Sequence, residues 1–136
     1  MRVVLDTNVL LSALISRDSA PARIYQAWQN GDFDLITATI QLEELRRASR
    51  YPKLRAVLEP HHVGRMINHL HRATIFDHVP SLYEADDPND SWLLSLADVA
   101  HADFLVTGDK KAGILGRGSV GRAQIVTTSA FAGRFD

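Results

Sequence analysis

The chain has 136 residues, 46% hydrophobic and 23% charged, which is the composition of a folded globular protein and the length of one domain. It contains no cysteine, and this excludes a disulfide framework, a thiolate zinc site, an iron–sulfur cluster and a cysteine nucleophile. The net charge of −1 hides an uneven distribution of the charged side chains. We therefore expect a single domain over residues 1–136.

The N-terminal apolar run does not predict a targeting segment. Asp6 interrupts it and no small-residue cleavage site follows, so we expect no signal peptide. No uncharged stretch approaches the about 20 residues that a membrane span needs. We therefore expect a cytoplasmic protein without a membrane partner.

The first half of the chain alternates between predicted strands and helices. A β-branched, apolar run at 2–5 ends at Asp6 and predicts a buried parallel strand. Helical spacing follows it to residue 15, with Asp6, Thr7 and Asn8 as possible caps. A helix begins at Pro21 and stops at Gly31, a strand spans 33–38, and Thr39 can cap a helix that Tyr51-Pro52 ends.

The second half repeats the alternation. Apolar residues at helical spacing follow Pro60 up to Leu70, and Trp92 begins another apolar helical face that ends at Ala100. Strands are predicted at 75–79, 104–107 and 124–127. Strands that alternate with helices predict a three-layer α/β/α fold with a central, mostly parallel sheet.

Charges separate along the chain. Between Arg72 and Lys110 there is no lysine or arginine, but there are eight acidic residues. In the other direction, five cations lie within ten residues: Arg46, Arg47, Arg50, Lys53 and Arg55. Each cluster is a solvated surface unless its members converge in space.

Carboxylates follow four predicted strand–helix junctions. Asp6 comes directly after a predicted strand and Asp109 two residues after another, whereas Asp90 and the pair Glu43-Glu44 lie near the beginnings of helices. Because the carboxyl ends of parallel strands share one edge of a sheet, we expect these acids to approach one another there. Crowded carboxylates need a cation, and oxygen ligands suit Mg²⁺ or a similar hard ion. Such an ion activates water for phosphodiester hydrolysis.

At these residues the sequence resembles the PIN domain. The resemblance rests on four segments in order: Asp6-Thr7-Asn8, Glu44-Leu45, Asp87-Pro88-Asn89-Asp90 and Val106-Thr107-Gly108-Asp109. It extends from about residue 2 to residue 131, and more narrowly the order of the motifs is similar to that of the bacterial PIN toxins of toxin–antitoxin pairs. It implies a Mg²⁺- or Mn²⁺-dependent endoribonuclease that cleaves single-stranded RNA, binds a cognate antitoxin and forms a homodimer.

The resemblance also implies roles for particular residues. The acidic, catalytic set would be Asp6, Glu44, Asp90 and Asp109, with Asp6, Asp90 and Asp109 as metal ligands. We prefer Glu44 to Glu43 because the acid of the family directly precedes a leucine, and here Glu44 directly precedes Leu45. Supporting roles would fall to Asn8 and Thr107, which orient acids through side-chain hydrogen bonds, and to Asp87, which caps a helix. Independently of the resemblance, Arg46, Arg47 and Arg50 lie on the predicted helix that carries Glu43 and Glu44, and we expect them to contact the phosphates of the RNA. Lys111 stands where many relatives carry a second aspartate, so the resemblance implies that only one ion binds tightly.

Three other motifs favour weaker hypotheses. The glycine pattern at 116–121 is a literal G-x-G-x-x-G, but it precedes a strand instead of following one, so we interpret it as a loop. Asp6-Thr7-Asn8 lacks the second aspartate of phosphatases that use an aspartyl nucleophile. The histidines around residues 61–78 lack the spacing of a zinc hydrolase helix. The alternative function is a non-catalytic PIN module that binds RNA or a protein.

The N-terminal helices carry more apolar residues than one face of a sheet needs. We expect the surplus to form a homodimer interface that includes Leu11, Leu14, Ile15, Ile24, Tyr25 and Trp28.

Overall fold

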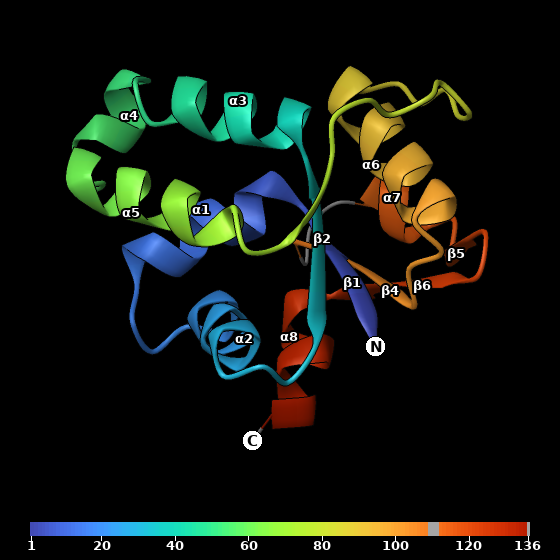
Figure 1. The fold of residues 1–136 in the computed structure, drawn as a ribbon, viewed down its shortest axis with the longest axis horizontal. Coiled ribbons are helices and arrows are strands. Elements are labelled where there is room, and N and C mark those ends of the chain that lie inside the picture. Colours follow the sequence, from blue (N-terminus) through green and yellow to red (C-terminus); the bar gives the residue numbers. More distant parts are fainter. Residues whose placement is uncertain (109–111, 136) are drawn as a thin grey trace.

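The computed structural model of the protein describes residues 1–108 and 112–135. Within these residues, six strands form one sheet in the order β3-β2-β1-β4-β6-β5 (Figure 1). The strands are β1 (Arg2–Leu5), β2 (Asp34–Ala38), β3 (Thr74–Phe76), β4 (Phe104–Thr107), β5 (Ser119–Val120) and β6 (Ala123–Thr127). All neighbours pair in parallel except β5 and β6, which are antiparallel. The predicted mostly parallel sheet is confirmed.

Helices cover both faces of this sheet. One face packs against α1 (Thr7–Ile15), α2 (Ala20–Gln29), α3 (Thr39–Ala48), α5 (Pro60–Leu70) and α8 (Thr128–Ala132). The other face packs against α6 (Pro88–Val99) and α7 (Ala112–Leu115). The single turn α4 (Pro52–Arg55) joins α3 to α5, and the 3₁₀ helix η1 (Gly133–Phe135) follows α8. The predicted three-layer α/β/α fold is confirmed.

The two layers of core follow from the period of two in a strand. Val3 and Leu5 of β1 pack in the cluster beneath α1 and α5, whereas Val4 between them packs against α6. Because both faces of the sheet are covered, the consecutive apolar residues of the central strands β1 and β2 are all buried. This explains why the strands have continuous apolar sequences and not alternating ones.

Several boundaries differ from the sequence prediction. Strand β3 ends at Phe76 instead of residue 79, and β5 and α8 were not predicted. Thr39 lies inside α3 and does not cap it; its hydroxyl donates to Asp77 Oδ1 at 3.2 Å. Phe131 of α8 is 1% exposed and packs edge-on against Phe33, so the C-terminal segment belongs to the core.

The apolar surplus expected at the N-terminal helices is smaller than predicted. Leu11 and Ile24 are buried inside the protomer, with Ile24 fully inaccessible, so neither can form an intermolecular surface. Leu14, Tyr25 and Trp28 are partly buried against the same core cluster, and Ile15 is exposed. No helix in the described part of the chain is long and apolar enough to cross a membrane.

Candidate active site

The order of the strands reverses between β1 and β4, which lie at the centre of the sheet. From β1 the chain continues to β2 on one side, whereas β4 and β6 extend the sheet on the other side. The backbone N–H of Asp6 donates to Val106 O at 2.8 Å and extends the pairing of β1 with β4 to this point. Ligands of open α/β sheets bind beyond the strand ends at such a reversal. The most favourable place for a site is therefore next to Asp6.

Asp6 is a buried carboxylate with two hydrogen bonds. Its side chain is 4% exposed, and Oδ1 accepts the backbone N–H of Asn8 at 3.2 Å as the N-cap of α1. Oδ2 accepts the hydroxyl of Thr107, itself fully buried at the end of β4, at 2.9 Å. The contact of Asn8 with Asp6 is made by its backbone N–H, and a side-chain hydrogen bond from Asn8 to one of the acids stays a prediction. Each carboxylate oxygen retains a second lone pair with which it can accept or ligate.

A buried glutamine that sequence reasoning missed connects four elements beside Asp6. Gln41 of α3 is 1% exposed, and its Nε2 donates to Leu5 O at 2.7 Å. Its Oε1 accepts the Thr37 hydroxyl of β2 at 2.6 Å, and Thr7 Oγ1 of α1 lies 3.4 Å from Nε2. These contacts fix the beginning of α3 against the ends of β1 and β2.

The two glutamates on α3 differ in their exposure to solvent. Glu44 lies three residues after Gln41, on the same side of the helix, and is half-buried. Glu43 is exposed, because adjacent helical residues point about 100° apart. Glu44 is therefore the member of the pair that faces the interior.

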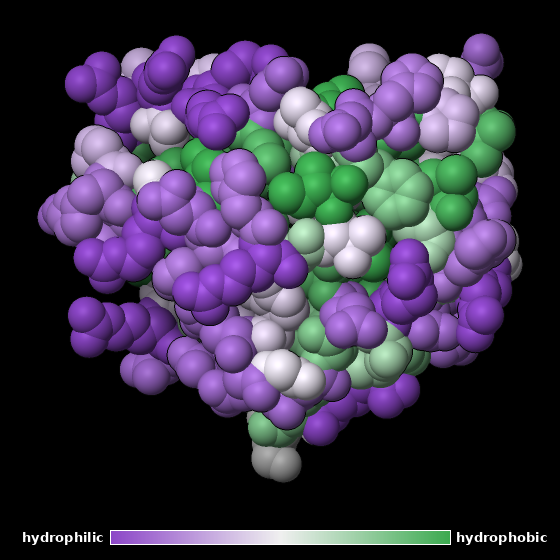
Figure 2. Space-filling view, viewed as in Figure 1, coloured by the Kyte–Doolittle hydropathy of each residue, from purple (hydrophilic) through white to green (hydrophobic). Residues whose placement is uncertain are grey.

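Cations collect on the part of the chain that continues from α3. We call residues 39–73, which include α3, α4 and α5, the basic arm (left in Figure 1). It carries seven lysines and arginines against three acids. Arg46, Arg47 and Arg50 are all exposed near the end of α3. Figure 2 shows hydrophilic residues over this side of the molecule, whereas apolar residues gather nearer α6.

The remaining acids surround the beginning of α6. Asp87 is the N-cap residue, and its Oδ1 accepts the N–H of Asn89 at 3.0 Å, whereas Asp90 lies in the first turn. Both line a cavity of about 290 Å³, which we call the acidic cavity, together with Glu84 and Asp86. Leu94 and Ile114 supply part of its apolar lining.

The loop before α6 is attached to that helix by two serines. Ser91 Oγ accepts the N–H of Ala85 at 2.9 Å, and Ser95 Oγ accepts the N–H of Leu82 at 3.2 Å. These bonds hold Glu84 and Asp86 beside α6 and so shape one wall of the acidic cavity.

The expected convergence of four acids stays a prediction. Across residues 1–108 and 112–135, no three histidines or acids lie close enough together to hold a metal ion. Asp109 lies outside the described residues. Asp6 is engaged with Thr107 at the sheet centre, whereas Asp90 lines the acidic cavity. The donor set nevertheless fits a hard divalent ion, since Mg²⁺ needs only one or two carboxylates in addition to water and substrate phosphate.

The comparisons with known proteins agree with this architecture. The PIN domain family model matches residues 2–111, and the chain therefore belongs to the PIN domain family. Its fold is similar to that of a chain in the solved structure of VapBC2 from Rickettsia felis bound to a DNA fragment from their promoter. That similarity has a TM-score of 0.61 at 18% identity and covers 93% of this chain and 98% of the other. The sequence has no significant match among curated proteins.

Membership of this family restricts the chemistry that the site can perform. PIN domains are generally nucleases and typically use divalent metal ions. The acids found here at the sheet reversal and at the beginning of α6 have the oxygen chemistry that such an ion requires.

Proposed function

We propose that this protein is a divalent-metal-dependent endoribonuclease that cleaves single-stranded RNA. The observation that carries the proposal is the placement of Asp6, a nearly inaccessible carboxylate fixed by Thr107 at the reversal of strand order. In a family whose members are generally nucleases, an acid fixed at this point supports a role in hydrolysis. The acidic set that we propose is Asp6, Glu44, Asp90 and Asp109.

The residues of the set have different tasks in this proposal. Asp6, Asp90 and Asp109 would hold Mg²⁺ or Mn²⁺, and Glu44 would orient the attacking water. When bound, the ion would lower the pKa of that water and offset charge on the phosphate. Thr107 keeps the carboxylate of Asp6 in one orientation through its hydrogen bond.

Two further groups of residues support the reaction without touching the reacting atoms. Asp87 fixes the beginning of α6, the helix that carries Asp90. Arg46, Arg47 and Arg50 would bind RNA phosphates from the basic arm, because cations that neutralise phosphates supply most of the sequence-independent affinity for nucleic acids.

We further propose that the nuclease is the toxin of a toxin–antitoxin pair and that it forms a homodimer. Support for an antitoxin partner is the fold shared with a chain of the VapBC2 complex. Support for a dimer comes from the apolar residues that the protomer leaves partly accessible, among them Leu14 and the exposed Ile15.

The nuclease proposal is tested with purified, partner-free protein, a mixed RNA pool and Mg²⁺ or Mn²⁺. We expect cleavage that EDTA abolishes and that Asp90→Asn eliminates, since this change keeps the shape of the side chain and removes its charge. Asp34→Asn is the matched control, because Asp34 is exposed at the opposite end of β2. Equal cleavage by wild type and Asp90→Asn would indicate a contaminating nuclease and contradict the proposal.

One observation favours a second candidate function, an RNA- or protein-binding PIN module that does not cut. It is the lack of a three-acid group within the described residues. If this candidate is correct, RNA will bind with the same affinity with and without Mn²⁺ and will remain intact.

A further inference from the structure

The acidic cavity at the beginning of α6 is also lined by one positively charged side chain, which has no role in the reaction proposed above. Glu84, Asp86, Asp87 and Asp90 contribute four carboxylates to its lining. Among the described residues that line it, Arg117 is the only lysine or arginine. A phosphate that approaches such a cavity is repelled by the acids, so a cation within it has a large effect on anion entry.

Arg117 lies against an aromatic ring that leaves its donors available. Its guanidinium carbon lies 5.6 Å from the centroid of the Tyr83 ring, within the range of a cation–π contact. A guanidinium carries five N–H donors in its own plane. Contact with a ring therefore limits where the group lies and leaves donors for a bidentate bond to phosphate oxygens.

The ring of Tyr83 is itself held by α6. Its hydroxyl donates to Asp98 Oδ2 at 2.6 Å. This hydrogen bond raises the pKa of the Tyr83 phenol above its usual value, so the phenol keeps its proton and remains a donor. Tyr83 therefore connects the loop before α6 to the third turn of that helix.

The glycine pattern at 116–121 completes the arrangement. Gly121 is the first of the two residues that join β5 to β6, and its φ of +56° is a conformation that favours glycine. A Cβ at this position would collide with the carboxylate of Asp98. Gly121, at one end of the pattern, therefore leaves room for the Asp98 side chain, and Arg117, near the other end, lines the acidic cavity.

We propose that Arg117 binds a phosphate group of the RNA at the acidic cavity, and that Tyr83 and Asp98 position its guanidinium. This inference rests on the nuclease function proposed above and assigns a substrate contact to it. Arg117 provides the charge and the bidentate donors. Tyr83 and Asp98 are positioning residues that act only through it.

The experiment compares Arg117→Ala and Arg117→Lys with Arg122→Ala as a matched control. Arg122 lies in the adjacent turn, and its Nη2 is 3.0 Å from Asp103 Oδ1, away from the acidic cavity. Cleavage of one single-stranded RNA gives kcat and KM. Binding of the same RNA is measured by fluorescence anisotropy over a series of salt concentrations, in the Asp90→Asn background.

We expect Arg117→Ala to raise KM and the RNA dissociation constant about tenfold to a hundredfold, the range for loss of a charge-assisted hydrogen bond. The slope of log affinity against log salt should decrease in size by about one. The KM and the RNA dissociation constant of Arg117→Lys should fall between those of wild type and of Arg117→Ala, because lysine keeps the charge but lacks the paired guanidinium donors of a bidentate bond. Arg122→Ala should behave as wild type.

The positioning role is tested by a double-mutant cycle. Tyr83→Phe keeps the ring and removes the hydroxyl, and we expect it to raise KM severalfold with kcat unchanged. In the Arg117→Ala background the same change should leave KM unaltered, because there is no guanidinium left to position. An equal effect of Tyr83→Phe in both backgrounds would overturn the positioning role.

The results separate this inference from the nuclease proposal. If wild type cleaves RNA and Arg117→Ala matches it in KM, affinity and salt slope, the inference is wrong and the nuclease proposal stands. If wild type does not cleave but Arg117→Ala still weakens RNA binding, the nuclease proposal is wrong and the phosphate contact stands.

Discussion

A carboxylate from which water is almost excluded depends on protein donors for its solvation, and Asp6 has two of them. One is a backbone amide that any residue at position 8 would supply, apart from proline. The other is the hydroxyl of Thr107, which comes from a strand 101 positions away along the chain. The identity of residue 107 is therefore the part of this arrangement that mutation can test.

Thr107→Val replaces the hydroxyl with a methyl group of similar shape. We expect the free energy of unfolding to fall by about 1–3 kcal/mol, because a buried charged acceptor loses one donor and gains none. Urea denaturation measures the change, with Thr74→Val on the exposed position of edge strand β3 as the control. An unchanged midpoint for Thr107→Val would mean that Asp6 obtains its solvation elsewhere.

At the scale of single residues, the sequence predicts where a side chain lies in the fold better than it predicts which residues that side chain contacts. Asp6 is recognisable because it ends an apolar run, and Glu44 because of the leucine that follows it. Gln41 is not recognisable, since a glutamine in a helix is usually exposed, and its partners come from β1 and β2. Arg117 was missed for the same reason: its contact with Tyr83 joins segments that lie far apart in the sequence.

At the scale of elements, the loop before α6 is a segment without regular structure that two serine side chains attach to a helix. Because Leu82 is 52% exposed, the loop offers an accessible bond to chymotrypsin whenever it detaches. Local opening of this kind needs much less free energy than global unfolding.

The double change Ser91→Ala and Ser95→Ala removes both attachments. We expect chymotrypsin to cleave near Leu82 and Tyr83 severalfold faster than in wild type, with little change in the melting temperature. Ser49→Ala, whose hydroxyl bonds only within its own turn, is the control. Cleavage at the wild-type rate would show that apolar packing alone holds the loop.

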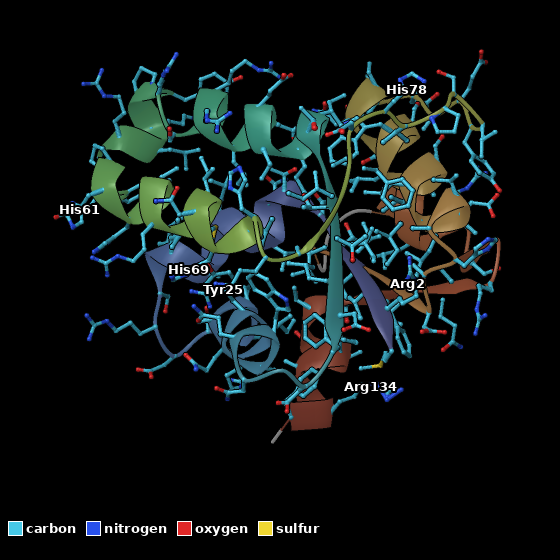
Figure 3. The ribbon with its side chains drawn as sticks, in the orientation of Figure 1. Arg2, Tyr25, His61, His69, His78 and Arg134 are labelled. Atoms are coloured by element: carbon cyan, nitrogen blue, oxygen red, sulfur yellow. The ribbon has the colours of Figure 1, made fainter. Side chains whose placement is uncertain are left out.

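A second contact between elements joins α2 to α5. The hydroxyl of Tyr25 lies 3.2 Å from His69 Nδ1, and Gln29 Nε2 lies 3.1 Å from the same atom (Figure 3). Burial raises the pKa of Tyr25 to about 12, although the Arg72 guanidinium opposes the shift. The folded protein therefore holds the phenolic proton more tightly than the unfolded chain does.

This difference predicts a loss of stability at alkaline pH. Between pH 10 and about 12 the unfolded chain ionises at Tyr25 and the folded protein does not. The contribution of Tyr25 to the free energy of unfolding is therefore fully present below pH 10 and is lost as the pH rises to about 12. Tyr25→Phe should flatten the decline of the urea midpoint over this interval, whereas Tyr51→Phe, on an exposed residue, should not. Parallel declines in wild type and Tyr25→Phe would contradict the assignment.

Apolar patterning in the sequence predicted most of the elements but few of the shortest ones. The helices α1, α2, α3, α5 and α6 were predicted because their apolar residues recur at helical spacing, and the strands β1, β2, β3, β4 and β6 because each is a short apolar or β-branched run. The elements α4, α7 and β5 have two to four residues, too few to show a period. Helix α8 was missed because Phe131 is buried by aromatic neighbours from distant segments.

At the scale of the whole molecule, the proposed metal site links ion binding to folding. An ion that binds only the native state stabilises it by about 2.7 kcal/mol at a hundred times its dissociation constant. We expect Mn²⁺ to raise the melting temperature of wild type, and Asp6→Asn to lose most of that increase. Asp34→Asn is again the control, and a full Mn²⁺ shift in Asp6→Asn would exclude Asp6 as a ligand.

The separation of the basic arm from the segment that follows it gives the molecule a permanent electric dipole. Residues 39–73 carry seven cations and three acids, whereas residues 74–108 carry seven acids and no lysine or arginine. Although the net charge is only −1, each of these two segments carries an excess of one sign of charge that it can present to a charged surface. At pH 7 and low salt we expect both cation- and anion-exchange resins to retain the protein in opposite orientations. Retention should vanish near 0.15 M salt, where the screening length falls to about 8 Å.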